Sequence, residues 1–446
     1  MINKITITLS LFLITLASIS QVRNYDDSAI LFSQENIKGT ARFTAMSGAF
    51  GALGGNLSAA DINPAGLAVF NTSNAAITLD NRNNSKDVSF ANITNSNTNN
   101  YINFAQGGAA LVFDTNNDSW NKFAIGINIT LTNDFENDYL IKGNNGFSNQ
   151  SYFHDPIITL DLYDNVDQQK MRNKTIGTNS KSTFTFAGQY KKNTYFGISL
   201  ISNSVESEQY VNINENSHDI NDNTFSAAQT QSLFTYGDGF SLNFGVITKP
   251  FKNIRLGLSY QTPTWYSLTE EFTEDLNINT SNSNSENYTD ESVFEYKMQT
   301  PSKITGSLAY VFGKKGLISF DYNYKDYSQI KISPTNDFNN ENTNLSTNFG
   351  GVNEFRIGGE YRLKRLSFRA GYHTEDSIYK NISSLNTDPK SGYSLGFGVK
   401  ILNNTKLDFS YDSTLSKDNY YYINAPLPAE ITKDNKRITA TLSFDL

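Results

Sequence analysis

Apolar and polar side chains alternate one by one in many short stretches of the chain. The clearest case is 123–131, where every odd position from Phe123 to Leu131 is apolar and the positions between hold Ala, Gly, Asn or Thr. The alternation recurs at 183–190, 240–246, 255–260, 318–325, 393–401 and 437–446. Successive side chains of a β-strand point to opposite faces of a sheet. These stretches therefore predict strands with one apolar and one polar face.

The connections between the predicted strands alternate in length. The short ones are 114–119, 192–193, 250–253, 313–316, 364–365 and 402–405, and the long ones are 134–181, 204–233, 275–291, 328–351, 375–390 and 417–435. Short turns at one rim and long loops at the other are typical of barrels in the outer membrane. We predict an all-β fold, a transmembrane antiparallel β-barrel of about fourteen strands. A soluble β-sandwich, which shows the same alternation, is the alternative.

Composition narrows the function classes. Aromatic residues make up 13% of the 446 residues, so the chain is not of the disordered type. The net charge of −8 lacks the basic excess that nucleic-acid binding requires, and we expect no nucleic-acid partner. The chain has no cysteine, so disulfides cannot stabilise it. Pairing every strand edge in a closed barrel is another way to achieve stability.

The N-terminus divides into two segments ahead of the barrel. Residues 1–20 have a lysine, an apolar stretch of about thirteen residues and small residues near Ser20, as a secretory signal peptide does. Residues 21–73 contain the long Gly/Ala-rich run Gly39–Phe70 and are predicted to form a hatch inside the lumen. Residues 74–446 then form the barrel. The expected location is the outer membrane of a Gram-negative bacterium, after cleavage near Ser20.

The Gly/Ala-rich run ends in a turn signature, Asn63-Pro64-Ala65-Gly66. Small residues allow a backbone to pack closely against a barrel wall. A barrel of fourteen strands is too wide for its own side chains to fill, so something must close it or water must pass. The run is the expected plug, and the turn is expected to fix it just before the first strand.

The turn sequence, the preceding Ser47-Gly48-Ala49-Phe50 and Leu57-Ser58-Ala59-Ala60, and the later stretches 300–312 and 317–328 resemble the FadL/TodX family of outer-membrane transporters for long-chain fatty acids and aromatic hydrocarbons. The resemblance implies a barrel of fourteen strands and an N-terminal hatch, and it assigns Asn63, Pro64, Ala65 and Gly66 to the hatch motif. It also implies that ligand leaves sideways through the wall where a strand kinks. Gly55-Asn56 stands where many relatives have an acidic pair, and the chain ends in Leu446 instead of an aromatic residue.

Two sets of residues are candidate sites. The strand expected at 101–113 loses its alternation at Gly107 and Gly108, which would permit a kink and a lateral opening. The polar face of two later strands carries Arg356, Glu360 and Arg362 on one and Arg369 and His373 on the next. Those cations either form a charge network with the acid or bind the carboxylate of a fatty acid.

The predicted function is passive uptake of hydrophobic small molecules through a channel that the hatch gates, with long-chain fatty acids or aromatic hydrocarbons as the expected ligands. The alternative is a surface scaffold or adaptor on the same barrel, for example in protein secretion. No catalytic site, metal site or cofactor is expected, and the protein is not expected to be an enzyme. The expected partners are the hydrophobic ligand and the lipid and lipopolysaccharide of the outer membrane, with the protein as a monomer.

Overall fold

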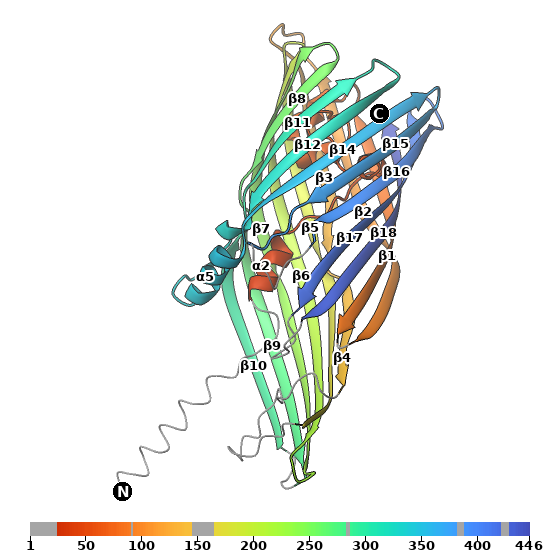
Figure 1. Cartoon of the computed structure of the whole chain (residues 1–446). Coiled ribbons are helices and arrows are strands. Elements are labelled where there is room, and N and C mark those ends of the chain that lie inside the picture. The colour runs from red at the N-terminus through yellow and green to blue at the C-terminus, as the bar shows by residue number, and fades with distance from the viewer. Residues whose placement is uncertain (1–24, 91, 145–164, 282–285, 381–387, 421–427) are drawn as a thin grey trace.

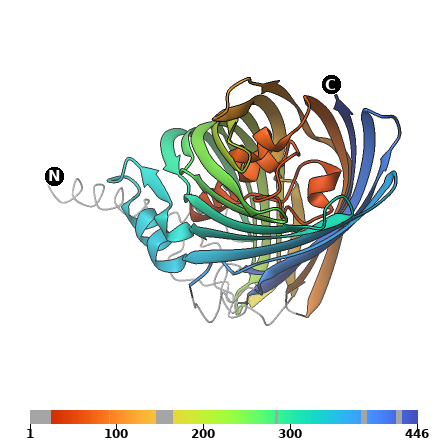
Figure 2. The same cartoon turned by 90° about the horizontal axis from the view of Figure 1, so that it is seen from above.

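A computed structural model describes residues 25–90, 92–144, 165–281, 286–380, 388–420 and 428–446. The expected signal peptide lies outside this part. The described chain forms one closed antiparallel sheet that surrounds short N-terminal helices (Figures 1 and 2). The strands are β1 Asn74–Phe90, β2 Ile93–Asp114, β3 Trp120–Asp134, β4 Asn137–Asn144, β5 Asn165–Tyr190, β6 Thr194–His218, β7 Thr224–Phe251, β8 Ile254–Gln261, β9 Trp265–Thr280, β10 Glu286–Gln299, β11 Lys303–Val311, β12 Gly316–Asp326, β13 Lys331–Ser333, β14 Gly351–Leu363, β15 Leu366–Glu375, β16 Lys390–Lys400, β17 Thr405–Tyr420 and β18 Ala429–Asp445.

Eight of these segments join in pairs, and each pair forms one continuous strand of the wall. β3 and β4 both pair with β5 in continuous register, and β8 with β9, β10 with β11, and β12 with β13 continue one another in the same way. The eighteen segments of the described residues therefore form a wall of fourteen strands, which confirms the predicted fold and strand number. The wall closes where β1 pairs with β18, from Asn74 opposite Asp445 to Ser89 opposite Glu430.

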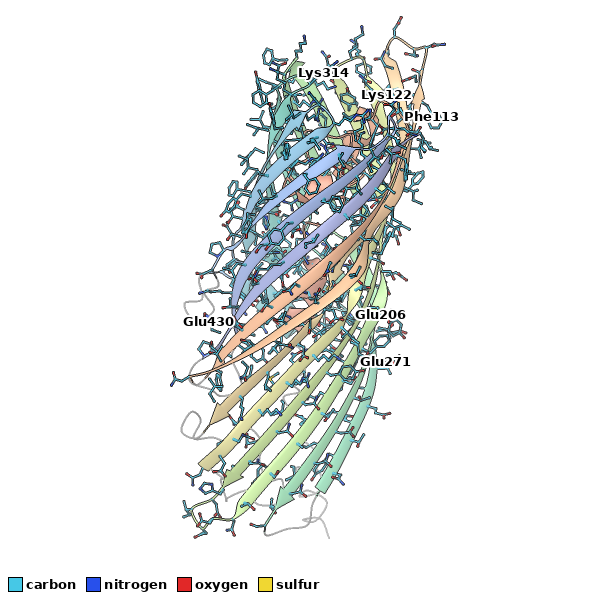
Figure 3. The ribbon with its side chains drawn as sticks, turned by 90° about the vertical axis from the view of Figure 1, so that its right-hand side faces the viewer. Phe113, Lys122, Glu206, Glu271, Lys314 and Glu430 are labelled. Atoms are coloured by element: carbon cyan, nitrogen blue, oxygen red, sulfur yellow. The ribbon has the colours of Figure 1, made fainter. Side chains whose placement is uncertain are left out.

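The two faces of the wall differ as the alternation predicts. Ile125, Ile127 and Ile129 on β3 are exposed on the outside, as are Leu395 and Phe397 on β16. Their polar neighbours, such as Asn128 and Ser394, are buried in the lumen. Figure 3 shows Phe113, Lys122 and Lys314 near the rim of short turns, which we call the turn side, and Glu206 and Glu271 near the middle of the barrel. We call the opposite rim the loop side.

Several segments expected as long loops are strands. The expected loop 204–233 contains the ends of β6 and β7, which are joined by residues 219–223, and the expected loop 134–181 contains β4 and the first half of β5. β5, β6, β7, β9 and β10 consequently extend well past β12 and β14–β16 (Figure 1). The outward face of their outer parts is mostly polar, whereas apolar side chains such as Val211, Ile213 and Phe225 are buried on the inner face. The outward face therefore lacks the apolar residues that mark a strand in the membrane.

The N-terminal residues lie inside the barrel (Figure 2). They form helices α2 Tyr25–Ser33, α3 Ala41–Thr44 and α4 Ala59–Ile62, followed by the 3-10 helix η1 Pro64–Val69. We call residues 25–73 the hatch. Leu57, Ala65 and Leu67 pack against Ala110 and Ala124 of the wall, and Phe43, Met46 and Phe50 pack against Ala309 and Leu317. These two apolar clusters hold the hatch across the lumen.

Glycines of the inner wall allow the hatch backbone to come close. A Cβ atom on Gly197 of β6 would lie 2.4 Å from the backbone of Ala65, and one on Gly245 of β7 would lie 2.0 Å from Asn63 Oδ1. A Cβ on Gly257 of β8 would lie 2.3 Å from Gly51 O. Real Cβ atoms do not approach so closely, so these wall positions require glycine as long as the hatch keeps its place.

The wall also carries two short helices outside the barrel strands. These are the 3-10 helix η2 Tyr327–Gln329 and helix α5 Asn339–Asn348, which lie between β12 and β14 along the chain. Leu345 of α5 is buried in an apolar cluster that also contains Ile30 of α2 and Tyr296 of β10. Within the described residues, no helix has both the length and the apolar character that a membrane span requires.

The glycine contacts predict that Gly245→Ala loosens the hatch. The added methyl group collides with the Asn63 amide, and relief of such overpacking costs about 1–3 kcal/mol. We expect a lower midpoint of heat unfolding, measured by circular dichroism of the purified protein in detergent. Gly306→Ala is the control, since no atom lies within 4 Å of the Cβ position of Gly306. Equal midpoints for the two variants would contradict the close contact.

Candidate functional site

The hatch turn connects two segments of the hatch to the wall. The Oδ1 atom of Asn63 accepts a hydrogen bond from Ala65 N at 3.1 Å, which starts helix η1. Its Nδ2 group donates to Gly51 O at 2.9 Å and to Val246 O of β7 at 3.1 Å. A single amide thus fixes the turn, the Gly/Ala-rich run and the barrel strand to one another. The structure therefore has the expected turn at residues 63–66, with Asn63 as its centre.

Buried carboxylates and a guanidinium provide further anchors for the hatch. Asp321 Oδ2 of β12 accepts hydrogen bonds from Phe50 N and Gly51 N, both at 2.9 Å. Arg42 of α3 donates through Nε to Glu360 Oε2 of β14 at 2.8 Å. Asp61 of α4 accepts from Thr183 Oγ1 of β5 at 3.2 Å. Bonds to charged groups are stronger than those between neutral groups.

Glu35 joins the hatch to three wall lysines. Its carboxylate lies 2.6 Å from Lys303 Nζ, 3.6 Å from Lys325 Nζ and 4.0 Å from Lys181 Nζ. Burial alone would raise the pKa of Glu35, but attraction to Lys303, Lys325 and Lys181 outweighs it and holds the pKa well below its ordinary value. The carboxylate therefore stays charged at neutral and mildly acidic pH. Its contribution to hatch docking is lost only when the pH falls through this depressed pKa.

The barrel wall has a long seam beside the hatch. β2 pairs with β1 from Ile93 to Ala110, but its pairing with β3 stops at Gln106 opposite Thr130. Residues 93–105 of β2 have no backbone ladder to β3 or β4 among the described residues. The outward side chains of Ile102 and Phe104 on this part are exposed and apolar. We call the space between residues 93–105 and 131–144 the seam.

The kink expected at Gly107 and Gly108 is wrong in position. Both residues pair regularly with β1 and with β3. The irregularity falls at the adjacent Ala105, where the register to β1 shifts between Thr78 and Leu79. The glycines instead permit close packing, since a Cβ on Gly108 would lie 2.5 Å from Ile127 O. The sequence thus indicated the correct strand and missed the site of its irregularity by two to three residues.

Side chains replace the backbone ladder along the seam. Asn103 donates to Asp134 Oδ2 at 3.3 Å, and Asn97 donates to Asp138 O at 3.2 Å. Arg82 of β1 also binds Asp134, and Lys86 binds Asn137. These contacts can break without disrupting a backbone ladder. The seam is therefore closed by side chains, among them the buried ion pair of Arg82 with Asp134.

A series of hydrogen-bonded side chains connects the hatch to the end of the seam. Ser58 Oγ donates to Gln106 Oε1 at 2.5 Å, Gln106 Nε2 donates to Asn128 Oδ1 at 2.6 Å, and Asn128 Nδ2 donates to Asp61 Oδ2 at 3.2 Å. All four side chains are buried. The series begins and ends in the hatch and passes through Gln106, the residue at which the pairing of β2 with β3 ends. The hatch is therefore hydrogen-bonded to the end of the seam.

A cavity of about 640 Å³ lies on the loop side of the hatch. It reaches the seam at Asp134, Phe135 and Asn137 and reaches helix α2 at Ile30. Apolar side chains, among them Ile30, Phe135 and Met171, line it together with many charged groups such as Lys38 and Arg437. We call it the loop-side cavity. Its volume suits a small organic ligand, since such pockets measure about 300–1,000 Å³.

The four residues proposed for a ligand carboxylate do not form one site. Arg356 binds Glu354 at 2.6 Å, Arg362 binds Glu360 at 2.6 Å, and Arg369 binds Glu360 at 2.7 Å and Asp408 at 2.6 Å. Each guanidinium thus has a carboxylate partner of the protein. His373 lines the loop-side cavity, whereas Arg362 and Arg369 line a second cavity on the turn side. The arrangement favours the charge network over a carboxylate site.

Sequence reasoning did not single out Gln106, Asn128, Asp61 and Glu35, nor the glycines of the inner wall. The glycines had a visible signal, since Gly245, Gly257 and Gly396 all fall on the polar face of predicted strands. A polar-face glycine on several strands indicates that something packs against the wall. The four polar residues had no such signal, because Asn, Gln and acids occur at many lumen positions.

The comparisons with known proteins agree with this geometry. A FadL homologue of Pseudomonas aeruginosa has 12% identity, a TM-score of 0.60, and coverage of 92% of this chain and 99% of its own. The toluene transporter TbuX of Ralstonia pickettii has 16% identity, a TM-score of 0.56, and coverage of 92% and 99%. The toluene transporter TodX of Pseudomonas putida has 14% identity, a TM-score of 0.55, and coverage of 93% and 100%. At these identities the likeness is one of fold.

Among curated protein sequences, none matches the chain. The family model described as outer membrane protein transport protein (OMPP1/FadL/TodX) matches residues 168–442, which is more than half of the chain. The resemblance to this family is thereby confirmed. The barrel lies in the outer membrane of a Gram-negative bacterium. The chain belongs to the OMPP1/FadL/TodX family of outer-membrane transport proteins.

Proposed function

We propose that this protein takes up hydrophobic small molecules with one charged end, of the long-chain fatty acid class, and releases them sideways through the seam. The observation that carries the proposal is the loop-side cavity, which combines apolar and charged walls and reaches the seam. A fatty acid matches both kinds of wall, since its chain needs apolar contacts and its carboxylate needs cations or water. A pure hydrocarbon would leave the charged groups without a ligand partner. The transporters TodX and TbuX, which are named for toluene, share only the fold.

A sideways exit fits the position of the seam. The hatch blocks the lumen on the turn side. A ligand in the loop-side cavity would therefore leave past Ile102 and Phe104, the apolar side chains that face outward beside the seam. Separation of Asn103 from Asp134 would open this path. Among the described residues, no observation favours the scaffold or adaptor function, and we do not propose it.

The hatch controls the exit in this proposal. Gln106 holds Ser58 of the hatch and Asn128 of β3 at the point where the β2–β3 ladder ends. Movement of α4 pulls on Asn128 through Asp61. The hatch therefore holds the seam closed while it is docked and permits its separation when it shifts.

Bridging the seam tests the exit. Because the chain has no native cysteine, Asn103→Cys with Asp134→Cys can be joined by a short bis-thiosulfonate reagent. We expect the bridge to abolish oleate uptake by cells without a transporter of their own, and reduction of the bridge to restore it. The control pair is Ser85→Cys with Thr98→Cys, whose oxygens lie 3.2 Å apart on strands that are already paired. Uptake that continues in the bridged protein would rule out the seam, and equal uptake of oleate and toluene would contradict the charged ligand class.

Removing the polar chain tests the control by the hatch. Gln106→Met keeps a side chain of similar length but loses the bonds to Ser58 and Asn128. We expect oleate uptake to rise by a few-fold, since loss of hydrogen bonds worth about 1–2 kcal/mol makes separation more frequent. Gln189→Met is the control, because Gln189 of β5 binds only a turn carbonyl, Lys192 O, at 3.2 Å. Slower uptake in the Gln106 variant, or the same rise in both variants, would contradict hatch control.

A further inference from the structure

Two cavities lie on opposite sides of the hatch along the same strands. The loop-side cavity is lined by Arg437 of β18 and Asp412 of β17, and a cavity of about 590 Å³ on the turn side is lined by Thr441 and Asp408 of these strands. Each pair is four residues apart. Since a strand rises about 3.3 Å per residue, the cavities are separated by about 13 Å of wall or less. We call the second space the turn-side cavity.

The material between the cavities is polar. Helix α3 and the residues after it meet the wall through hydroxyl groups: Ala41 N donates to Thr441 Oγ1 at 2.7 Å, Thr44 Oγ1 lies 2.6 Å from Ser410 Oγ, and Ser47 Oγ lies 2.8 Å from Ser394 Oγ. The other side of this segment is apolar and packs Phe43 and Met46 into the hatch. The contact between α3 and β16–β18 is therefore a polar interface beside an apolar one.

A polar interface of this kind can take up water. A hydrogen bond between two hydroxyl groups contributes only about 1 kcal/mol, because water can replace either partner. Thr439 Oγ1, midway between the two cavities on β18, is buried and has no hydrogen-bond partner within the described protein. Lys38 Nζ, which lines the loop-side cavity, also lacks one. Both groups gain a partner when water enters the interface.

The turn-side cavity has a charge preference. Seven cationic side chains line it against three acidic ones, and Lys364, Arg365 and Lys400 lie among them at the turns of β14–β16. An excess of one charge in a confined space raises the local concentration of ions of the opposite sign. Small anions are therefore favoured at this end of the path, whereas the loop-side cavity, with ten acidic and eight cationic side chains, has no such excess of cations.

We propose that the barrel contains a second passage, a water-lined path for small anions that runs along β1 and β14–β18 and is closed by the contact of α3 with β16–β18. The path is distinct from the seam: it is axial and polar, and it connects the two sides of the membrane directly. It opens when the three hydroxyl contacts give way to water. The apolar half of the hatch, from Leu57 to Ala68, stays docked on β2–β7 meanwhile.

A disulfide across the interface tests the passage. Thr44 Oγ1 and Ser410 Oγ are close enough for cysteines at these positions to join. We expect wild-type protein in a planar bilayer to conduct ions, with a reversal potential in a KCl gradient shifted toward that of chloride. The oxidised Thr44→Cys/Ser410→Cys protein is expected to lose this conductance and to regain it on reduction. Recovery in the same molecules shows that the variant is folded.

The control is a variant with a disulfide at another position of the barrel. Oxidised Ser85→Cys/Thr98→Cys, away from the interface, should conduct as the wild type does. Conductance that survives the Thr44–Ser410 disulfide, a preference for potassium over chloride, or a wild-type protein that conducts no ions would each overturn the passage. Oleate uptake by the same preparations separates the two proposals, because a wild-type protein that takes up oleate but conducts no ions refutes only the passage.

Discussion

Backbone pairing of β1 with β18 is the constraint on which the rest of the structure depends. A wall in lipid must satisfy every backbone donor and acceptor from within, because the bilayer core offers no water. The ladder from Asn74 to Ser89 closes the sheet and removes its edges along this line. Closure then divides the side chains into an apolar outer set and a polar inner set, and the polar lumen must be filled by water or by the protein itself.

The hatch fills that lumen and is held there largely by hydrogen bonds and ion pairs to the polar wall. Apolar contacts alone could not hold it, since most inner wall residues are polar. It is held by Asn63 on a strand carbonyl, Asp321 on two hatch amides, Arg42 on Glu360 and Glu35 on three lysines. Glycines of the wall bring the two backbones close enough for these bonds. The hatch is thus hydrogen-bonded to the wall at several points, and it can shift only where those bonds are weak.

The weak places differ in chemistry. At the seam, side-chain contacts stand in for a backbone ladder beside exposed apolar residues, and this suits a ligand that is leaving toward lipid. At α3, hydroxyl groups face one another between two charged cavities, and this suits water and ions. In the functions we propose, one hatch serves two paths, because its two halves rest on different surfaces of the same barrel.

The sequence by itself determined the fold class, the strand number and the hatch. Strict alternation in stretches such as 123–131 fixes which face meets lipid, and the Gly/Ala-rich run before Asn74 differs from every strand. Only the tertiary structure decided the rest. Long strands such as β6 looked like loops, because the outward face of their outer part is polar, while Val211 and Ile213 are buried on the inner face. The arginines of β14 and β15 could belong to a charge network or to a ligand site. Glu354 and Glu360 lie two residues from Arg356 and Arg362 on the same strand, but strand register was needed to bring Arg369 to Glu360 and Asp408. The irregularity of β2 lies at Ala105, where the pairing of three strands decides it and the local preference of two glycines does not.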